Sequence, residues 1–127
     1  MSRVLIADDE PHIRKLVSFT LTNHGHEVLE ATDGGEAVDM IAAEHPDLVL
    51  LDVMMPVMTG YDALRRLKAD PATADIPVVM LSAKSQRAEV AEGLDCGAQD
   101  YICKPFTPKD LVQRVGEILG TSGEGAR

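Results

Sequence analysis

Short apolar runs alternate with helical patterns along the chain, and this alternation restricts the fold more than any other feature of the sequence. It is typical of β–α–β units, in which each helix returns the chain to the next strand of a parallel sheet. The apolar runs predict strands at Val4–Ala7, Glu27–Ala31, Leu48–Leu51, Val78–Leu81 and Tyr101–Cys103. The sequence therefore predicts an α/β domain with five strands.

The polarity of each run indicates its place in the sheet. VLIA, LVLL and VVML are continuously apolar, as strands covered by helices on both faces should be. HEVLEAT instead alternates polar and apolar residues, the pattern of a strand with one face partly exposed to water. We expect the three apolar strands in the middle of the sheet and Glu27–Ala31 at an edge.

Apolar residues at helical spacing predict helices between the strands. The predicted starts lie at Pro11, after Asp33, after Thr59-Gly60 and at Thr107-Pro108, where Asp110 stands three residues after the cap. A further helix near Ser85–Gly93 has a weak apolar stripe and is expected to be the least firmly held. Five strands and five helices fit a flavodoxin-like doubly wound parallel sheet, whose commonest strand order is 2-1-3-4-5.

Length and charge limit the organisation and the partners. A chain of 127 residues with 45% hydrophobic residues suits one domain, predicted over residues 1–120, with 121–127 as a flexible tail or the start of a linker. A net charge of −9 repels nucleic-acid backbones and anionic lipid, so we expect no direct binding to nucleic acid or membrane. Acidic residues follow the first few apolar ones too soon for a signal peptide, and we expect a cytoplasmic protein.

Several residue types give no sign of a site. The two cysteines, Cys96 and Cys103, lack the paired spacing of zinc ligands, and the four histidines lack mutual metal spacing. We interpret them as ordinary thiols and surface histidines. The methionines after Asp52 are interpreted as loop and core filling.

Polar residues instead follow the predicted strands where each one ends: Asp8 and Asp9, Asp52, Ser82 and Lys104. Ligands of open α/β sheets bind at this carboxyl edge. Three carboxylates, a hydroxyl and an ammonium gathered there would be costly unless something compensates their charges. The set therefore predicts a functional site.

Charge arithmetic indicates its chemistry. Two carboxylates about 4 Å apart repel each other by roughly 4 kcal/mol at an effective dielectric constant near 20, and one lysine cannot balance three of them. An all-oxygen cluster with few protein ligands suits Mg²⁺, with Mn²⁺ as a substitute. With such a cation bound, Asp52 could act as a nucleophile toward a phosphoryl group, with Lys104 and Ser82 contacting phosphoryl oxygens.

Four motifs now occur in order: ADDE after the first strand, LLDVMMPVMTG around Asp52, LSAK after the fourth strand and KPF after the fifth. Together they resemble the response-regulator receiver family of bacterial two-component systems, the CheY-like receivers, over Arg3 to Leu119. The resemblance implies that Asp52 is the phosphoacceptor. It also implies a cis peptide before Pro105.

The resemblance further assigns the metal shell and the switch. Asp9 and Asp52 would bind Mg²⁺ directly, Asp8 largely through water, and Met54 through its backbone carbonyl. Lys104 would pair with phosphoryl oxygens, and Ser82 would move toward them while Tyr101, the switch aromatic, turns inward. Met54 and Lys84 would flank the path of an attacking water and so set the lifetime of the acyl phosphate.

The implied partners are a sensor histidine kinase or phosphotransfer protein as donor, and a downstream protein or the chain's own output domain as target. The target would bind the face formed by the fourth helix, fifth strand and fifth helix. The oligomeric state stays open, because the apolar face of the final helix could pair with a second copy of the chain or with a partner. The protein would be a signalling domain that assists only its own phosphorylation and dephosphorylation.

Three other functions remain open at this point. A flavin-binding protein of the same fold would need backbone N–H groups and hydroxyls cradling a phosphate where this chain has Asp8, Asp9 and Glu10. A phosphatase that forms an aspartyl phosphate would need an acid/base carboxylate just beyond Asp52, where Val53, Met54 and Met55 stand. A receiver that signals by binding alone would not need the complete set of site residues.

Overall fold

The sheet has five parallel strands in the order β2-β1-β3-β4-β5. The computed structural model describes residues 2–82, 97–104 and 106–119. The strands are β1 (Arg3–Ala7), β2 (Glu27–Ala31), β3 (Leu48–Asp52), β4 (Val78–Ser82) and β5 (Asp100–Cys103). The predicted order is confirmed, and every predicted strand is present to within one residue at each end.

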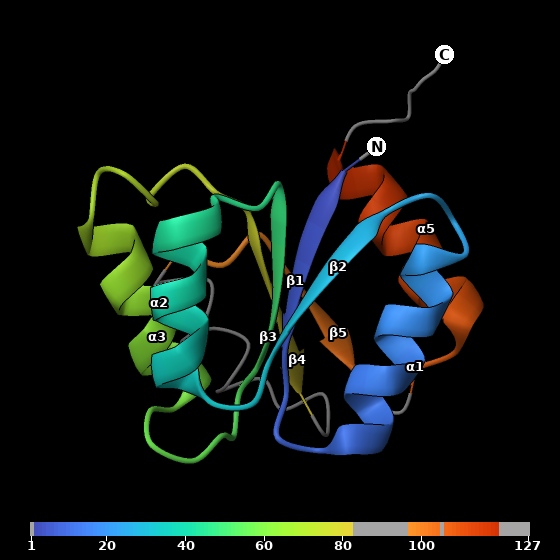
Figure 1. The fold of residues 1–127 in the computed structure, drawn as a ribbon, viewed down its shortest axis with the longest axis horizontal. Helices are drawn as coiled ribbons and strands as arrows, with labels where there is room; N and C mark the ends of the chain where they lie inside the picture. Colours follow the sequence, from blue (N-terminus) through green and yellow to red (C-terminus); the bar gives the residue numbers. More distant parts are fainter. Residues whose placement is uncertain (1, 83–96, 105, 120–127) are drawn as a thin grey trace.

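The described residues form four helices: α1 (Pro11–Thr22), α2 (Gly34–Glu44), α3 (Gly60–Ala69) and α5 (Pro108–Leu119). Helices α1 and α5 cover one face of the sheet, and α2 and α3 cover the other (Figure 1). The predicted helix near Ser85–Gly93 and the predicted tail lie outside the described residues. Among the helices that are described, none is long and apolar enough to span a membrane.

The starts of three helices follow the predicted signals. The Asp33 side chain accepts a hydrogen bond from the Glu36 N–H, and Thr59 accepts one from the Asp62 N–H. Thr107 and Asp110 bond reciprocally, with each backbone N–H donating to the other's side chain at 3.3 and 3.0 Å. Such caps satisfy backbone N–H groups that the first helical turn leaves without intrahelical partners.

Two apolar cores lie on opposite faces of the sheet, because successive strand residues point to opposite sides. Leu5, Val49 and Met80 belong to the core beneath α2 and α3. Ile6 and Leu50 belong to the core beneath α1 and α5. Strands β1, β3 and β4 are almost wholly buried and occupy the middle of the sheet, while β2 and β5 form its edges, as predicted.

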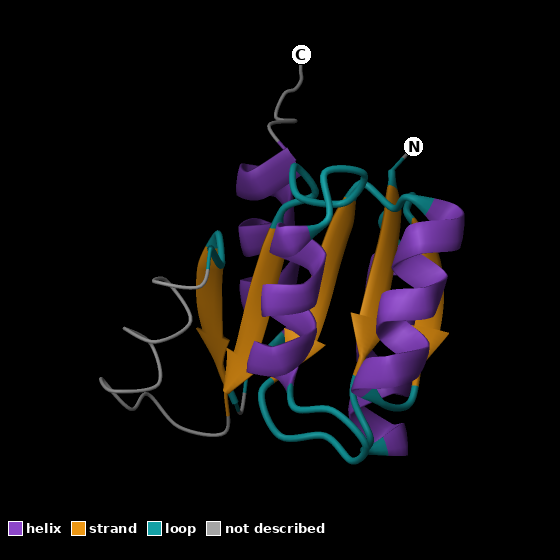
Figure 2. Cartoon of the chain, turned by 90° about the vertical axis from the view of Figure 1, so that its left-hand side faces the viewer, coloured by secondary structure: helices purple, strands orange, loops and turns teal. Residues whose placement is uncertain are grey.

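The parallel arrangement brings the carboxyl ends of all five strands to one end of the molecule (Figure 2). Hydrogen bonds beyond the strands extend this alignment. The Asp8 N–H donates to the Ala31 carbonyl at 3.2 Å, and the Lys104 N–H donates to the Ser82 carbonyl at 2.6 Å. Residues that follow different strands are therefore fixed side by side at this edge.

Candidate functional site

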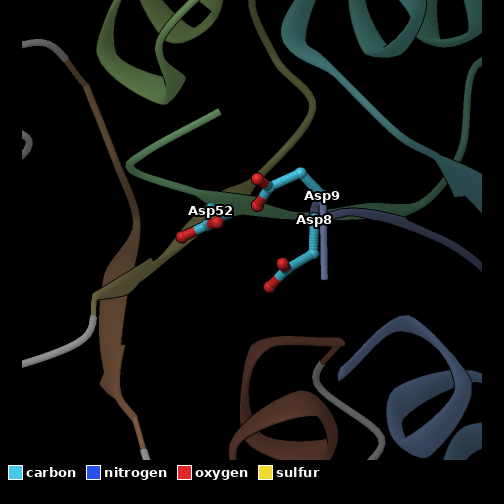
Figure 3. Close-up of side chains that lie close together, drawn as sticks. All are labelled: Asp8, Asp9 and Asp52. Atoms are coloured by element: carbon cyan, nitrogen blue, oxygen red, sulfur yellow. The ribbon is translucent and has the colours of Figure 1, made fainter. Parts of the chain in front are cut away.

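Three carboxylates meet at the carboxyl edge of the sheet. Oxygens of Asp8, Asp9 and Asp52 all lie within 4.8 Å of one another (Figure 3). Asp8 is fully buried and Asp52 is 5% exposed, whereas Asp9 is exposed. The structure thus brings together the three carboxylates that the sequence singled out, with one of them open to solvent.

The Lys104 ammonium lies among these carboxylates. Its Nζ atom is 2.7 Å from Asp8 Oδ2, 3.3 Å from Glu10 Oε1 and 3.4 Å from Asp52 Oδ1. The predicted grouping of Lys104 with the acidic residues is therefore present, and its shortest contact is with Asp8. The cluster holds four carboxylates, counting Glu10, against the one ammonium of Lys104, so it keeps an excess of negative charge.

Burial and neighbouring charges shift the protonation equilibria here. Burial, reinforced by the charge of Asp8, raises the pKa of the Asp52 carboxyl to about 6, although Lys104 and a hydrogen bond from the Met54 N–H oppose the rise. Burial alone would lower the pKa of Lys104, but its hydrogen bond to Asp8 and the charge of Asp52 outweigh burial, and the net pKa is raised. Lys104 is therefore charged at neutral pH, and Asp52 ionises at an energetic cost.

The Asp8 position is fixed from three sides. Its Oδ1 atom accepts a hydrogen bond from the Glu10 N–H at 2.9 Å, and its Oδ2 atom accepts the Lys104 bond. Its backbone carbonyl accepts a 2.7 Å hydrogen bond from Arg14 Nη1, and Arg14 also pairs with Glu30 on β2 at 3.5 Å. The sequence did not predict these contacts of Glu10 and Arg14, because no local pattern marks a contact between a loop carbonyl and a helix side chain.

The loop between β3 and α3, residues 53–59, is exposed at its middle and tightly packed where it meets α3. Met54 is 72% exposed and Val57 is 84% exposed, whereas Met55 is buried. The loop closes at Gly60, whose N–H donates to the Val53 carbonyl at 2.9 Å. A Cβ atom on Gly60 would lie 2.2 Å from the Asp52 carbonyl oxygen, so the start of α3 directly contacts the backbone of Asp52.

Ser82 and Tyr101 complete the described part of the predicted site. Ser82 is buried at the end of β4, next to Cys103 of β5 in the register. Tyr101 is also buried, and its hydroxyl donates to the Tyr61 hydroxyl at 2.8 Å. The sequence predicted an inward movement of Tyr101 but not a partner on α3. Lys84 and the bond before Pro105 lie outside the described residues.

The donor set fits a hard divalent cation. It consists only of oxygen atoms, gathers three carboxylates in a small space and leaves Asp9 open to solvent, as a cation that retains several waters requires. Within the described ranges, this cluster contains no histidine or cysteine ligand, which disfavours a zinc or copper site. Asp8, Asp9 and Asp52 are thus suited to Mg²⁺ or Mn²⁺.

The sequence of the chain matches a known protein family. The sequence model of the response regulator receiver domain family matches residues 4–116. The phosphate regulon transcriptional regulatory protein PhoB of Pseudomonas aeruginosa is 44% identical over 122 residues, which are 96% of this chain and 53% of that protein. PhoB of Escherichia coli is 43% identical over 117 residues, covering 92% of this chain and 51% of that protein. The chain therefore spans about half the length of these curated relatives.

Solved receiver structures also resemble this chain, and the resemblance covers nearly the whole length of both chains. Chemotaxis protein CheY4 of Vibrio cholerae has a TM-score of 0.89 and 34% identity, covering 93% of this chain and 98% of that chain. The receiver domain of the Francisella response regulator 1452 has a TM-score of 0.88 and 31% identity, covering 97% of this chain and 100% of that chain. At these identities the likeness extends beyond the strand order to the sequence.

Proposed function

Because the chain belongs to the response regulator receiver domain family of two-component systems, we propose that Asp52 is its phosphoacceptor and that phosphorylation requires Mg²⁺. One observation carries the proposal: the buried Asp52 carboxylate lies with Asp8, Asp9 and Lys104 at the carboxyl edge of the sheet. The family is a signalling domain, so the chemistry serves a conformational signal rather than turnover of a metabolite.

The proposed step is attack by an Asp52 carboxylate oxygen on the phosphorus atom of a phosphohistidine. The new P–O bond forms as the P–N bond breaks, and the imidazole nitrogen keeps the bonding electron pair and takes up a proton. A histidine kinase or phosphotransfer protein would supply that phosphohistidine. The product is an aspartyl phosphate on this chain.

Each site residue has a proposed part in this transfer. Asp9 and Asp52, with the Met54 carbonyl, would hold Mg²⁺ directly, and the buried Asp8 would act largely through water. When bound, Mg²⁺ supplies positive charge that lets two anions approach each other. Lys104 is held 3.4 Å from Asp52 and would exchange part of its contact with Asp8 for a phosphoryl oxygen.

The remaining assignments rest on family membership and sequence position. Ser82 would move toward a phosphoryl oxygen, and Tyr101, the switch aromatic, would turn inward with it. Met54 and Lys84 would set the lifetime of the aspartyl phosphate, which the chain itself would help to hydrolyse. The signal would reach a downstream protein, an output domain or a second copy of the chain through the face that includes β5 and α5. We place these events in the cytoplasm, without direct nucleic-acid contact by residues 1–120.

The first experiment is the intact mass of the protein after incubation with acetyl phosphate, with and without Mg²⁺. We expect a Mg²⁺-dependent gain of one phosphoryl group in the wild type and in Asp39→Asn, an exposed carboxylate on α2 outside the cluster, but none in Asp52→Asn. No gain in the wild type under either condition would contradict the proposal and favour a receiver that signals by binding alone.

The same samples test the other two functions. Multiple turnover of a phosphate monoester would favour a phosphatase, and bound flavin, visible by its absorbance, would favour a flavoprotein. We expect neither, because Asp8, Asp9 and Glu10 stand where a flavin phosphate would need hydrogen-bond donors.

A further inference from the structure

Two tyrosine hydroxyls meet inside the protein at a point that the chemistry of Asp52 does not use. Tyr101 of β5 and Tyr61 of α3 are 7% and 8% exposed, and the Tyr101 hydroxyl donates to the Tyr61 hydroxyl at 2.8 Å. They are separated by 40 positions in the sequence and are the only tyrosines of the chain. A buried hydroxyl is costly unless it is hydrogen-bonded, so this pairing favours the inward position of both rings.

Tyr61 is in turn tied to the acceptor residue. It follows Gly60, which is so close to the Asp52 carbonyl that a Cβ atom there would lie 2.2 Å from the oxygen. The Gly60 N–H also donates to the Val53 carbonyl, and α3 is capped by Thr59 at this end. The Tyr61 backbone is therefore held by the end of β3, independently of β5.

The Tyr101 backbone is held from the other side of the sheet. Its carbonyl accepts a 3.0 Å hydrogen bond from Arg114 Nη1 of α5, and Arg114 also pairs with Asp100. The side chain can therefore change its rotamer while its backbone stays in place. An outward rotation would break the hydrogen bond to Tyr61.

We infer that Tyr61 is a positioning residue that latches Tyr101 in the inward position, and that it thereby sets how readily the domain switches. The inference rests on the proposed function for its consequence, because Tyr101 is there the aromatic that moves. The latch itself consists of two groups of the polypeptide and is available whether or not Asp52 carries a phosphoryl group. Tyr61 would lower the cost of the inward state before any signal arrives.

The alternative is that the two rings are ordinary core packing and that Tyr101 stays inside with or without the hydroxyl of Tyr61. The conservative variant Tyr61→Phe separates the two, since it keeps the ring and removes the hydroxyl. Because the chain has no tryptophan, this variant leaves Tyr101 as its only strongly fluorescent side chain. Its accessibility to the quencher acrylamide can therefore be measured without labelling.

We expect Tyr61→Phe to lower the ratio of inward to outward Tyr101 by about fivefold, the effect of losing one hydrogen bond. The acrylamide quenching constant should rise at least about twofold above that of the wild type. The matched control, Tyr101→Phe, leaves Tyr61 as reporter, and we expect Tyr61 to stay protected because its ring lies on the buried face of α3, within the core. Far-ultraviolet circular dichroism establishes that both variants are folded.

A second set of quenching measurements, made after incubation with acetyl phosphate and Mg²⁺, tests the coupling of Tyr101 to Asp52. In Tyr61→Phe, acetyl phosphate should restore protection of Tyr101, because a phosphoryl group would then favour the inward state without the latch. An unchanged quenching constant in unphosphorylated Tyr61→Phe would overturn the latch. Increased quenching that acetyl phosphate does not reverse would support the latch and overturn the proposed coupling to Asp52, so the two failures are distinguishable.

Discussion

Val57 adopts a backbone conformation that its side chain disfavours. Its φ angle is 71°, in the left-handed region where a β-branched residue is strained, and its side chain is 84% exposed, so little packing offsets the strain. Strain of this kind often lies beside functional residues, and Val57 stands in the loop that follows Asp52.

Val57→Gly should therefore stabilise the protein. Relief of the left-handed strain outweighs the greater backbone entropy of glycine in the unfolded chain, and we expect a net gain of about 1 kcal/mol in the free energy of unfolding. The measurement is urea denaturation. The matched control is Val112→Gly within α5, which should lose about 0.5 kcal/mol because the helix requires no positive φ there and glycine is the poorer helix former. A loss in Val57→Gly would mean that the exposed side chain makes a stabilising contact.

Asp52 carries a penalty that depends on pH. Its folded pKa is raised to about 6 from an unfolded value of 3.8, chiefly by burial. Between pH 3.8 and about pH 6, the Asp52 carboxyl therefore stays protonated in the folded protein but is ionised in the unfolded chain. The contribution of Asp52 to stability is consequently most unfavourable above about pH 6 and disappears as the pH falls toward 4.

Asp52→Asn removes this penalty. In the presence of EDTA, the variant should be more stable than the wild type at pH 7 by up to about 3 kcal/mol, and the difference should shrink toward pH 4. Urea unfolding of both proteins at several pH values measures it. Equal stabilities at pH 7 would mean that the Lys104 ion pair already offsets the cost of burying the charge.

The end of β3 depends on one glycine at the first position of α3. A Cβ atom on Gly60 would lie 2.2 Å from the Asp52 carbonyl oxygen and 2.9 Å from Met80 Cε. Methionine can move aside freely, but the end of β3 can shift only at the cost of its pairing with the neighbouring strands. The contact between α3 and β3 therefore requires a residue without a side chain.

Gly60→Ala should destabilise the protein by about 3 kcal/mol through this overpacking. It should also weaken Mg²⁺ binding, because the strain is released by displacing Asp52. Thermal unfolding and calorimetric Mg²⁺ titration measure the two effects. The control is Gly116→Ala in α5, where a Cβ atom would meet nothing within 4 Å and should stabilise the helix by about 0.5 to 1 kcal/mol. Similar effects of both substitutions would contradict the packing argument.

The elements that were predictable from the sequence are those whose signals are local. The cap of α5 at Thr107 and Asp110 formed as predicted, because both partners lie within one turn. The clustering of Asp8 and Asp52 was predictable because parallel strands share a carboxyl edge. The strand ends shifted by one residue because Asp52 and Ser82, although polar, still pair with their neighbours in the sheet.

Contacts between side chains of different elements were not predictable in this way. The Tyr61–Tyr101 hydrogen bond and the Arg14 bond to the Asp8 carbonyl depend on how a helix is rotated against the sheet. Helical periodicity gives the buried face but not the residue that meets a given strand position. Glu10 was visible as part of an acidic run, yet only the fold brings it to 3.3 Å from Lys104.

Charge connects the site to the stability of the whole molecule. The chain has a net charge of −9, and part of that excess is concentrated where Asp8, Asp9 and Asp52 meet. Folding brings these carboxylates together, whereas the unfolded chain lets them separate. A cation that binds the folded cluster should therefore stabilise the entire domain by mass action.

Mg²⁺ should raise the melting temperature by about 10 °C at a concentration 100 times its dissociation constant, which corresponds to about 2.7 kcal/mol. Asp9→Asn should lose most of this response while remaining folded, because Asp9 belongs to the carboxylate cluster but is exposed, so the substitution leaves the core intact. Asp39→Asn removes an equal charge outside the cluster and should respond like the wild type. Sodium chloride at matched ionic strength separates specific binding from screening. If it stabilised the wild type as much as Mg²⁺ does, the carboxylates would be acting only as a diffuse negative surface.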